Sequence, residues 1–427
     1  MTGIFIGLGL LLLALFGTSL FVIISAIALI AFYFAGIDST AVIIELYRLA
    51  SQPVLLAIPL FTFAGYLLAE SNTPKRLFNL SRALLGWLPG GLAIVTLVSC
   101  AIFTAFTGAS GVTIVALGGL LYPLLIQENY SEKFSLGILT ASGNLGLLFP
   151  PSLPIILYGL VSETSIDKLF LAGIIPGAIM VVLLSLYSVL YIKKTSQGQI
   201  KIKVSFKELV KSGREAIWEI PLPVIILGGI YTGFFTATEA AAVTAFYVLF
   251  IEVIIYRDIS IKKDLPRVIR ESMVMVGGIL VILSAALGLA NYLIDAEIPM
   301  QILEGMKGVV STKIEFLLVL NIFLLIVGAM MDIFSAIMVV APLVIPIASN
   351  FGVDPVHLGI IFLANLGIGY STPPVGMNLF IASFRFDQPI IKLYRATIPF
   401  LVILLIALIL ITYIPELSLW LVGVFGV

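Results

Sequence analysis

Long apolar stretches separated by short polar ones run through the whole chain. The polar positions divide it into two sets, each of five predicted membrane crossings and one re-entrant hairpin. The first set comprises 3–16, 18–34, 53–70, a hairpin at 91–126, a crossing broken at its middle at 134–160, and 166–192. The second set comprises 221–233, 236–256, 272–294, a hairpin at 314–349, a broken crossing at 356–384, and 389–415. Stretches such as 166–192 are long enough to cross a hydrocarbon core of ~30 Å, so the predicted fold class is an all-α polytopic membrane protein.

One short motif occurs twice, each time inside an apolar stretch. The first copy, 143–152, reads Gly-Asn-Leu-Gly-Leu-Leu-Phe-Pro-Pro-Ser, and the second, 365–376, reads Asn-Leu-Gly-Ile-Gly-Tyr-Ser-Thr-Pro-Pro-Val-Gly. The offset between the two Pro-Pro pairs is 223 residues, and it also relates Gly65 to Gly288, Pro123 to Pro346 and Pro176 to Pro399. Because five crossings is an odd number, the second copy must enter the membrane upside down. We therefore predict two inverted repeats, 1–192 and 221–427, as in transporters whose site lies where broken helices meet.

Composition agrees with a membrane protein and excludes several other classes. The chain of 427 residues is 61% hydrophobic and only 11% charged, whereas soluble domains are about a quarter charged. The apolar runs are continuous rather than alternating, which excludes an outer-membrane barrel. A net charge of zero gives no case for nucleic-acid binding. The sequence contains no Walker loop, metal-ligand cluster or nucleophile–base pair, so we predict that it is not an enzyme and uses no organic cofactor.

The basic residues are distributed unevenly between the two sides of the membrane. Of 23 lysines and arginines, only Arg48, Lys168, Lys307 and Lys313 fall on one side. The other side collects the remaining basic residues: Lys75, Arg76, Arg82, Lys133, Lys193, Lys194, Lys201, Lys203, Lys207, Lys211, Arg214, Arg257, Lys262, Lys263, Arg267, Arg270, Arg385, Lys392 and Arg395. This excess marks the cytoplasmic face. Both termini are then periplasmic, the hairpin 91–126 enters from the cytoplasm, and the hairpin 314–349 enters from the periplasm.

Polar stretches between the crossings are predicted to lie at the membrane surface. The basic segment 193–220 joins the two repeats and is predicted to form an amphipathic helix on the cytoplasmic face. Segments 40–51 and 74–88, with 262–271 and 297–308 as their counterparts, are either interfacial helices flanking moving bundles or ordinary loop helices. The beginning of the chain carries no basic residue before its apolar run, so we expect a retained first helix rather than a signal peptide.

The first hairpin tip is rich in glycine and small hydroxyl residues. It reads Phe106-Thr107-Gly108-Ala109-Ser110-Gly111-Val112-Thr113. Such a turn inside the membrane leaves backbone carbonyls that need a partner. A dehydrated Na⁺ is one such partner, because this hard cation prefers oxygen ligands. Close helix packing through small residues is the alternative, and the tip alone favours it.

The two broken crossings carry the stronger indication of a binding site. Pro150-Pro151 must stop the first helix at about Phe149, and Pro373-Pro374 acts in the same way in the second repeat. A helix that restarts inside the membrane presents free N–H groups and the positive end of its dipole to an anion. The carbonyl end of the preceding half-helix suits a cation. A kinked helix without a ligand is the alternative, and recurrence of the motif argues against it.

Four ionisable residues lie in or beside apolar sequence. Asp332, at the second hairpin tip, is an ion ligand or a helix cap, with the two roles equally favoured. We predict that Glu239 is a structural cap, that Glu252 lies near the cytoplasmic interface without a special role, and that His357 is a surface residue.

Across nearly its whole length the chain resembles the large membrane subunit (DctM-type) of tripartite ATP-independent periplasmic (TRAP) transporters. The matching motifs are Ile58-Pro59-Leu60-Phe61 with Gly65, the tip 107–113, Phe149-Pro150-Pro151-Ser152, Gly173-Ile174-Ile175-Pro176-Gly177, Thr236–Ala240, Gly328–Asp332 and Thr372-Pro373-Pro374-Val375-Gly376-Met377-Asn378. The resemblance implies an elevator-type importer of organic acids, driven by co-transported Na⁺, in the bacterial inner membrane. It also implies two separate partners, a small four-helix membrane subunit and a periplasmic substrate-binding protein.

The resemblance also implies positions for the ligands. One Na⁺ site would involve Thr107, Gly108, Ser110, Gly146, Phe149 and Pro150, and a second would involve Asp332, Gly369, Thr372 and Pro374. The substrate would lie near Asn144, Ser152, Gly376 and Asn378. Two positions depart from the usual pattern, because Ala109 replaces a common serine and Ala237 a frequent proline.

Three other functions are alternatives for this sequence. A stand-alone Na⁺-coupled di- or tricarboxylate transporter would need no binding protein. A channel would line a continuous pore, yet the chain lacks a repeated charged ring or a carbonyl filter motif. An intramembrane enzyme would need catalytic groups that the sequence lacks. The identity of the organic acid stays open among four-carbon dicarboxylates, sugar acids such as sialic acid, keto acids and sulfonates.

Overall fold

The computed structural model describes residues 18–36, 51–195, 206–306 and 310–426, with a few isolated positions between 13 and 47. The described residues form helices and no strands, which confirms the predicted fold class. Most of the predicted crossing 3–16, most of the predicted surface segment 40–51 and part of the linker 193–220 lie outside the described residues.

The helices follow the predicted crossings closely. In the first half they are α2 (Leu20–Ala35), η1 (Pro53–Leu56), α4 (Ala57–Glu70), α5 (Thr73–Leu85), α6 (Gly91–Thr107), α7 (Ser110–Gln127), α8 (Glu132–Ser142), η2 (Leu145–Leu148), α9 (Leu153–Ser162) and α10 (Ile166–Thr195). After α11 (Phe206–Glu215) come α12 (Pro221–Pro223), η3 (Val224–Gly228), α13 (Gly229–Tyr231), α14 (Ala237–Phe250), η4 (Ile251–Ile255), α15 (Asp264–Asp295), α16 (Ile298–Met306), α17 (Lys313–Met330), α18 (Ile333–Asn350), α19 (Pro355–Gly369), α20 (Met377–Phe386), α21 (Ile390–Tyr413) and α22 (Glu416–Phe425).

Many of these helices are long enough to span a membrane. Eight of the described helices are long and apolar enough to cross a bilayer, and the bent pair Glu132–Leu148 and Leu153–Ser162 adds a ninth candidate. Helix starts also follow the sequence offset. Helices α7 and α18 begin at Ser110 and Ile333, and α8 and α19 begin at Glu132 and Pro355, each 223 residues apart. The inverted orientation of the two copies stays a prediction.

Two boundary predictions were wrong. The segment 262–271 is not a separate interfacial helix, because α15 runs without a break from Asp264 to Asp295. No proline or glycine interrupts its backbone near residue 272, and Pro266 lies in the first turn, where it costs no hydrogen bond. The second error is an omission, since α22 follows the crossing 389–415 after Pro415.

Local capping determines where several helices begin. The side chain of Thr236 accepts from the backbone N–H of Glu239, while Glu239 accepts from the N–H of Thr236, and this capping box starts α14. The predicted role of Glu239 as a cap is confirmed. Thr312 and Glu315 form the same motif at α17.

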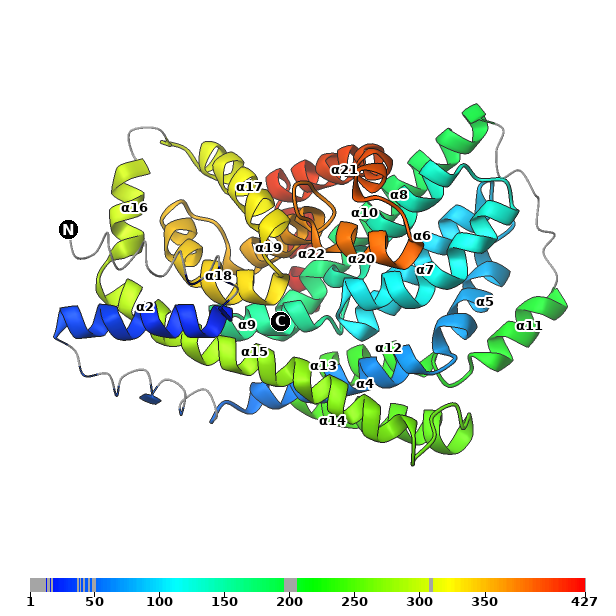
Figure 1. The fold of residues 1–427 in the computed structure, drawn as a ribbon, viewed down its shortest axis with the longest axis horizontal. Helices are drawn as coiled ribbons and strands as arrows, with labels where there is room; N and C mark the ends of the chain where they lie inside the picture. The colour runs from blue at the N-terminus through cyan, green and yellow to red at the C-terminus, as the bar shows by residue number, and fades with distance from the viewer. Residues whose placement is uncertain are drawn as a thin grey trace.

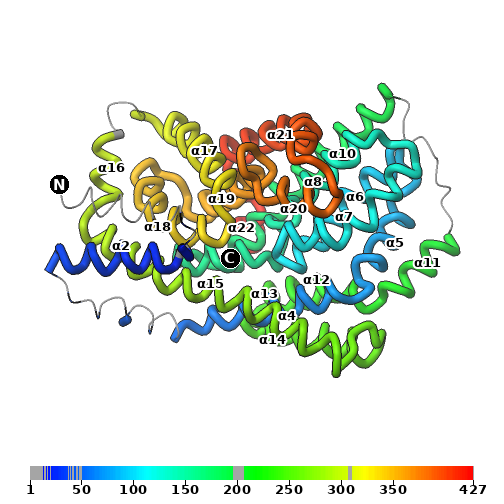
Figure 2. Tube along the Cα trace, in the orientation of Figure 1, coloured from blue at the N-terminus to red at the C-terminus, as the bar shows by residue number. Residues whose placement is uncertain are grey.

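The helices form two interpacked layers. Helices α2, α4, α14 and α15 lie along one side of the molecule and α17 and α21 along the opposite side, with α18, α19 and α20 between them and α6, α7 and α8 beside them (Figure 1). Elements of the two halves interleave, since α20 packs on α7, α18 on α9 and α21 on α8. Figure 2 shows the same interleaving along the backbone. The core therefore surrounds the broken crossings rather than dividing between two separate domains.

Large buried side chains fill the space between these helices. Tyr158 on α9, Phe362 on α19 and Phe400 on α21 are among the largest fully buried side chains. The rings of Tyr158 and Phe362 lie 5.6 Å apart, centroid to centroid. This packing places the break of the first half next to α19, which leads into the break of the second half.

Candidate functional site

Both predicted breaks are present. In the first half the helix axis bends by 46° between Glu132–Leu148 and Leu153–Ser162. In the second half α19 ends at Gly369 and α20 begins at Met377. Both Pro-Pro peptide bonds are cis. Each break leaves irregular backbone between two half-helices; the first is buried or half-buried, whereas Pro374, Val375 and Met377 at the second are exposed. Irregular backbone is tolerated at membrane depth only where protein or a cavity surrounds it.

A chain of buried side-chain hydrogen bonds joins the breaks to the first hairpin tip. The Ser110 hydroxyl donates to Asn378 Oδ1 at 2.8 Å, and Asn378 Nδ2 donates to Asn144 Oδ1 at 2.7 Å. Asn144 Nδ2 then donates to the Ser371 hydroxyl at 2.9 Å. All four side chains are buried, with at most 4% of their surface exposed. The structure therefore brings together three residues predicted for ligand binding, Ser110, Asn144 and Asn378, and adds Ser371.

The first hairpin tip packs closely against α4. Gly108 lies in the left-handed region with φ of 65°, which ends α6 in a way that suits glycine. A Cβ added at Gly65 would lie 2.8 Å from the carbonyl oxygen of Phe106 and 2.8 Å from Cα of Thr107. Gly65 is thus required for the close approach of the tip, which gives a physical reason for its place among the motifs.

The second hairpin tip packs on the second break in a similar way. A Cβ added at Gly369 would lie 2.6 Å from the carbonyl carbon of Gly328. The N–H of Gly376 donates to the carbonyl oxygen of Ala329 at 2.9 Å. Asp332 Oδ1 accepts from the N–H groups of Phe334 and Ser335, each at 3.0 Å, so Asp332 caps α18. Of the two roles left open for Asp332, the cap is present, and that of ion ligand stays a prediction.

A cavity of about 580 Å³ lies where both tips meet α4 and α15. Its walls are Tyr66, Ala69, Glu70, Gly108, Ala109, Ser110, Gly111, Val112, Val115, Ala116, Leu147, Val268, Glu271, Met275, Asp332, Ile333, Phe334, Tyr370, Met377 and Ile381. Among these described wall residues are three carboxylates and no lysine, arginine or histidine. The tip residue Ser110 also lines the cavity, and its hydroxyl donates to Asn378. Such a lining suits a cation, because carboxylate, hydroxyl and carbonyl oxygens are its preferred ligands.

The residues predicted for the first Na⁺ site do not all face this cavity. Gly108 and Ser110 line it, whereas Phe149 and Pro150 line a separate apolar cavity of about 380 Å³ beside Phe106. Gly146 packs against α6, where an added Cβ would lie 2.3 Å from the carbonyl oxygen of Ala101. The Thr107 hydroxyl donates to the Phe103 carbonyl oxygen at 3.1 Å. These four residues surround the tip rather than the cavity, and their role as ligands is untested.

Two residues predicted for the second Na⁺ site are joined by a backbone hydrogen bond, in which the N–H of Thr372 donates to the carbonyl oxygen of Gly369 at 2.9 Å. The Thr372 hydroxyl donates to the carbonyl oxygen of Ile368 at 2.9 Å, and the carbonyl oxygen of Pro374 accepts from Tyr394. Only Asp332 of this set lines the cavity. Among the predicted substrate residues, Ser152 is fully buried, and its hydroxyl has no hydrogen-bond partner among the described residues.

Two predictions about ionisable residues were wrong. His357 is not a surface residue, because its side chain is completely buried and its Nε2 lies 3.2 Å from the carbonyl oxygen of Thr412. Glu252 does have a special environment, since it is fully buried and forms an ion pair with Arg76. Position near a helix end suggested exposure for His357, and the packing of α21 on α19 covers it. Glu252 is covered by α5, whose Thr73 and Arg76 contact its carboxylate. The wall residues Tyr66, Glu70, Glu271 and Tyr370 were missed, although an acid beside an apolar run was a usable signal.

Comparison with known proteins identifies the family. The family described as "Tripartite ATP-independent periplasmic transporter, DctM component" matches residues 5–417. The chain is similar to the C4-dicarboxylate TRAP transporter large permease protein DctM of Pseudomonas aeruginosa, with 39% identity over 88% of each chain. It is 38% identical to the isethionate TRAP transporter permease protein DctMQ of Oleidesulfovibrio alaskensis, over 86% of this chain and 58% of that protein.

A solved structure supports the fold independently. The YdaH transporter of Alcanivorax borkumensis superposes with a TM-score of 0.62, covering 91% of this chain and 88% of that chain at 15% sequence identity. This likeness concerns the fold alone. The match over almost the whole length and the identity to several large permease proteins concern the family, which consists of transport subunits rather than enzymes. The chain therefore belongs to the DctM family, the large membrane permease subunits of tripartite ATP-independent periplasmic transporters for organic acids.

Proposed function

We propose that this permease subunit imports an organic anion together with Na⁺ across the bacterial inner membrane. The observation that supports this most is the cavity at which the tips of both hairpins meet, with Glu70, Glu271 and Asp332 in its walls. Arg267, just outside the wall, forms an ion pair with Glu70, which leaves Glu271 and Asp332 as the wall carboxylates that repel an anion and attract a cation. An anion then binds well only after a cation has entered, so the affinities of the two solutes are reciprocally linked.

The anion would be held by helix ends and amides rather than by a fixed positive charge. The restarting helices α9 and α20 begin next to Ser152 and Asn378, and helix N-termini favour carboxylates and sulfonates. Asn144 and Asn378 supply amide groups between the two breaks. The names of the relatives include a C4-dicarboxylate and the sulfonate isethionate, and both are small organic anions. We infer the same class for this chain.

We propose an elevator mechanism with two partner proteins. The layer of α2, α4, α14 and α15 would stay fixed, while the hairpins and broken crossings would carry the site across the membrane. Helices α5 and α16 would connect the two parts, because each follows a helix of the fixed layer and packs on a hairpin helix. A small membrane subunit would extend the fixed layer, and a periplasmic binding protein would deliver the anion.

The cavity also indicates a direction of opening. Glu70 and Glu271 are exposed wall residues close to Arg267, on the face that collects the basic residues. We infer that the cavity opens to the cytoplasm and that both termini are periplasmic. Cysteine labelling in intact cells tests the orientation. Lys168→Cys should react with a membrane-impermeant maleimide and Lys207→Cys should not, and the reverse result would overturn the topology.

Uptake by proteoliposomes that contain both partner proteins tests the coupling. An inward Na⁺ gradient should drive accumulation of a C4-dicarboxylate, isethionate or another anion that the binding protein selects. Replacing Na⁺ by K⁺, or dissipating the gradient with an ionophore, should stop it. Uptake that is indifferent to the Na⁺ gradient would remove the coupling from the proposal. Uptake that continues without the binding protein would favour a stand-alone carboxylate transporter.

A further inference from the structure

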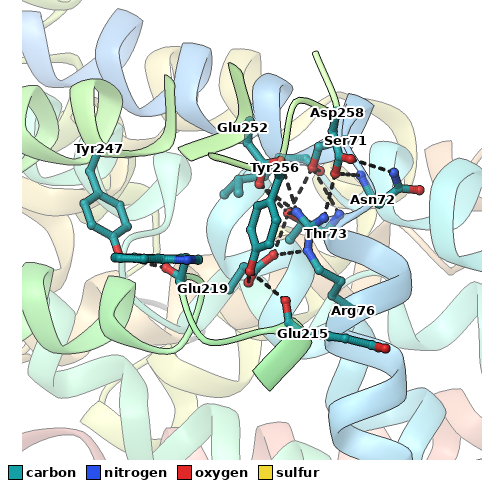
Figure 3. A network of polar contacts seen from close by, with 12 residues as sticks. Ser71, Asn72, Thr73, Arg76, Glu215, Glu219, Tyr247, Glu252, Tyr256 and Asp258 are labelled. Carbon is teal, nitrogen blue, oxygen red and sulfur yellow. Dashed lines mark hydrogen bonds and ion pairs between the residues drawn. The ribbon is translucent and has the colours of Figure 1, made fainter. Parts of the chain in front are cut away.

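A buried ion cluster lies at the corner between α4 and α5, away from the cavity. The guanidinium of Arg76 forms ion pairs with three carboxylates, those of Glu219, Glu252 and Asp258. Its Nη2 donates to both oxygens of Glu252 at 3.0 Å, and its Nη1 donates to Asp258 at 2.6 Å. Figure 3 shows these residues arranged around the end of α5.

Two further side chains complete the surroundings of the guanidinium. The Arg76 Cζ lies 3.7 Å from the ring centroid of Tyr256, so the ring covers the flat face of the guanidinium. The Tyr256 hydroxyl donates to Glu219 at 2.9 Å. Thr73 donates to Glu252 at 2.8 Å. Only the planar fork of arginine can bind several carboxylates and stack on a ring at the same time, so lysine is not equivalent here.

The cluster fastens a corner that consists of only two residues. Helix α4 ends at Glu70 and α5 begins at Thr73. Between them, both the backbone N–H and the side-chain amide of Asn72 donate to Asp258, each at 2.9 Å. The partners Glu219, Glu252 and Asp258 come from the end of the linker, from η4 and from the loop that precedes α15. The direction in which α5 leaves α4 is therefore set by contacts to the linker and to two segments of the second half.

Helix α5 continues into the part of the molecule that carries the site. It packs along α6, whose opposite end is the tip at Thr107 and Gly108, and it also packs on α11 of the linker. A rotation of α5 about the corner would therefore move α6 and displace the tip. Breaking a buried ion pair leaves an uncompensated charge, so the corner resists such a rotation as long as the guanidinium is in place.

The corresponding helix of the second half lacks this device. At the repeat offset of 223 residues, Pro299 stands where Arg76 stands in the first half, and Ala296 where Thr73 stands. Helix α16 is mostly apolar, and the sulfur of its Met300 accepts a weak hydrogen bond from Asn350 at 3.8 Å. Within the described part of the chain, an ion cluster fastens the first connecting helix but not the second.

We propose that Arg76 is a positioning residue that holds α5 at a fixed angle to α14 and so keeps the first hairpin tip in register with the second. The corner between α4 and α5 is then rigid, so the relative motion of the fixed layer and the site takes place between α5 and α6, at residues 86–90, and at α16, which has mainly apolar contacts. This inference rests on the proposed elevator mechanism. A positioning role differs from a purely stabilising role, because the cluster then affects the rate of transport and not the affinity for the ion.

Distance measurements between α5 and α14 test the position of α5. Nitroxide labels at Leu84→Cys and Phe246→Cys, in a Cys100→Ser background, report this distance by pulsed electron paramagnetic resonance. Both labelled side chains are exposed, at 49% and 71% of their surface. Arg76→Gln should broaden or shift the distance distribution, and Arg76→Lys should restore it only in part. Lys211→Gln, which removes an exposed i,i+4 pair on the neighbouring α11, should leave it unchanged.

Transport kinetics provide the second measurement. Arg76→Gln should lower the maximal uptake rate about tenfold, as expected for a displaced site, with the half-saturating Na⁺ concentration changed less than about twofold. An unchanged distance distribution in Arg76→Gln, or a half-saturating concentration that changes as much as the rate, would overturn the inference. If Arg76→Gln is not recovered folded, Asp258→Asn should give the same changes with smaller size. Normal distance and rate in Asp258→Asn would also overturn it.

The two proposals can fail separately. If uptake by the parent protein does not depend on the Na⁺ gradient, the coupling is refuted, but the distance measurement still tests the role of Arg76. Parent protein with Na⁺-coupled uptake, together with Arg76→Gln protein of normal rate and distance, would refute only the role of Arg76.

Discussion

Replacing Asn378 by leucine removes two hydrogen bonds from the buried centre of the protein while keeping a side chain of similar volume. Asn378 accepts from Ser110 at 2.8 Å and donates to Asn144 at 2.7 Å. In membrane proteins an interhelical hydrogen bond contributes about 0.6 kcal/mol on average and at most about 1.7 kcal/mol, because the unfolded chain also finds partners in the membrane. The two bonds therefore predict a loss of about 1–3 kcal/mol in the free energy of unfolding.

Unfolding in mixed micelles of sodium dodecyl sulfate, followed by tryptophan fluorescence, measures this loss. Asn350→Leu is a matched control, because Asn350 is exposed and donates to a carbonyl oxygen of its own helix and only weakly, at 3.8 Å, to the sulfur of Met300. The control should change the free energy of unfolding by less than about 0.5 kcal/mol. A double-mutant cycle with Asn144→Leu isolates the contact between the two amides, for which we expect a coupling of about 0.5–2 kcal/mol.

Two results would refute this reasoning. The first is a loss for Asn378→Leu no larger than that of the control. The second is strict additivity of Asn144→Leu and Asn378→Leu, which would mean that the two amides do not stabilise each other. Uptake should fall in both single variants irrespective of stability, because the amides also lie between the two breaks.

Three other substitutions test separate features of the site. Gly65→Ala should abolish uptake, because the added Cβ would meet the backbone of Phe106. Gly277 on α15 has open space around it, so Gly277→Ala should keep parent uptake. Equal uptake rates of the two variants would refute the packing argument. Asp332→Ala removes the helix cap and should lower the free energy of unfolding by about 1 kcal/mol, whereas Asp332→Asn can still cap and should keep most of that stability. If Asp332→Asn also keeps the parent Na⁺ affinity in uptake assays, Asp332 is a cap and not an ion ligand. Glu239→Ala should lower the thermal unfolding temperature without changing the half-saturating Na⁺ concentration, and a changed Na⁺ response would contradict a purely structural cap.

The prolines made the breaks predictable. A Pro-Pro pair cannot continue a helix, whatever surrounds it, and both breaks lie where the two pairs stand. The pattern Thr-x-x-Glu likewise predicts a helix start, because both partners of the capping box lie within one turn. These features depend on interactions between residues that are close in the sequence.

The exposure of single residues was less predictable. His357 lies in the first turn of α19, and a position near a helix end suggested a surface residue. It is buried because α21, which begins more than thirty residues later, brings the carbonyl oxygen of Thr412 against its ring. The cavity walls Tyr66 and Glu271 were missed for a similar reason, since α4 and α15 meet there from opposite halves of the chain.

Hydropathy and proline positions thus suffice to predict the described crossings and the breaks, because each depends on the membrane or on neighbouring residues. They do not predict that Asn144 pairs with Asn378, or that Arg76 meets Glu219, Glu252 and Asp258. Lipid tails are as apolar as a protein core, so an apolar helix carries little information about which partner it will pack against. Those pairings depend on small residues such as Gly65 and Gly369, whose effect exists only once two backbones have come into contact.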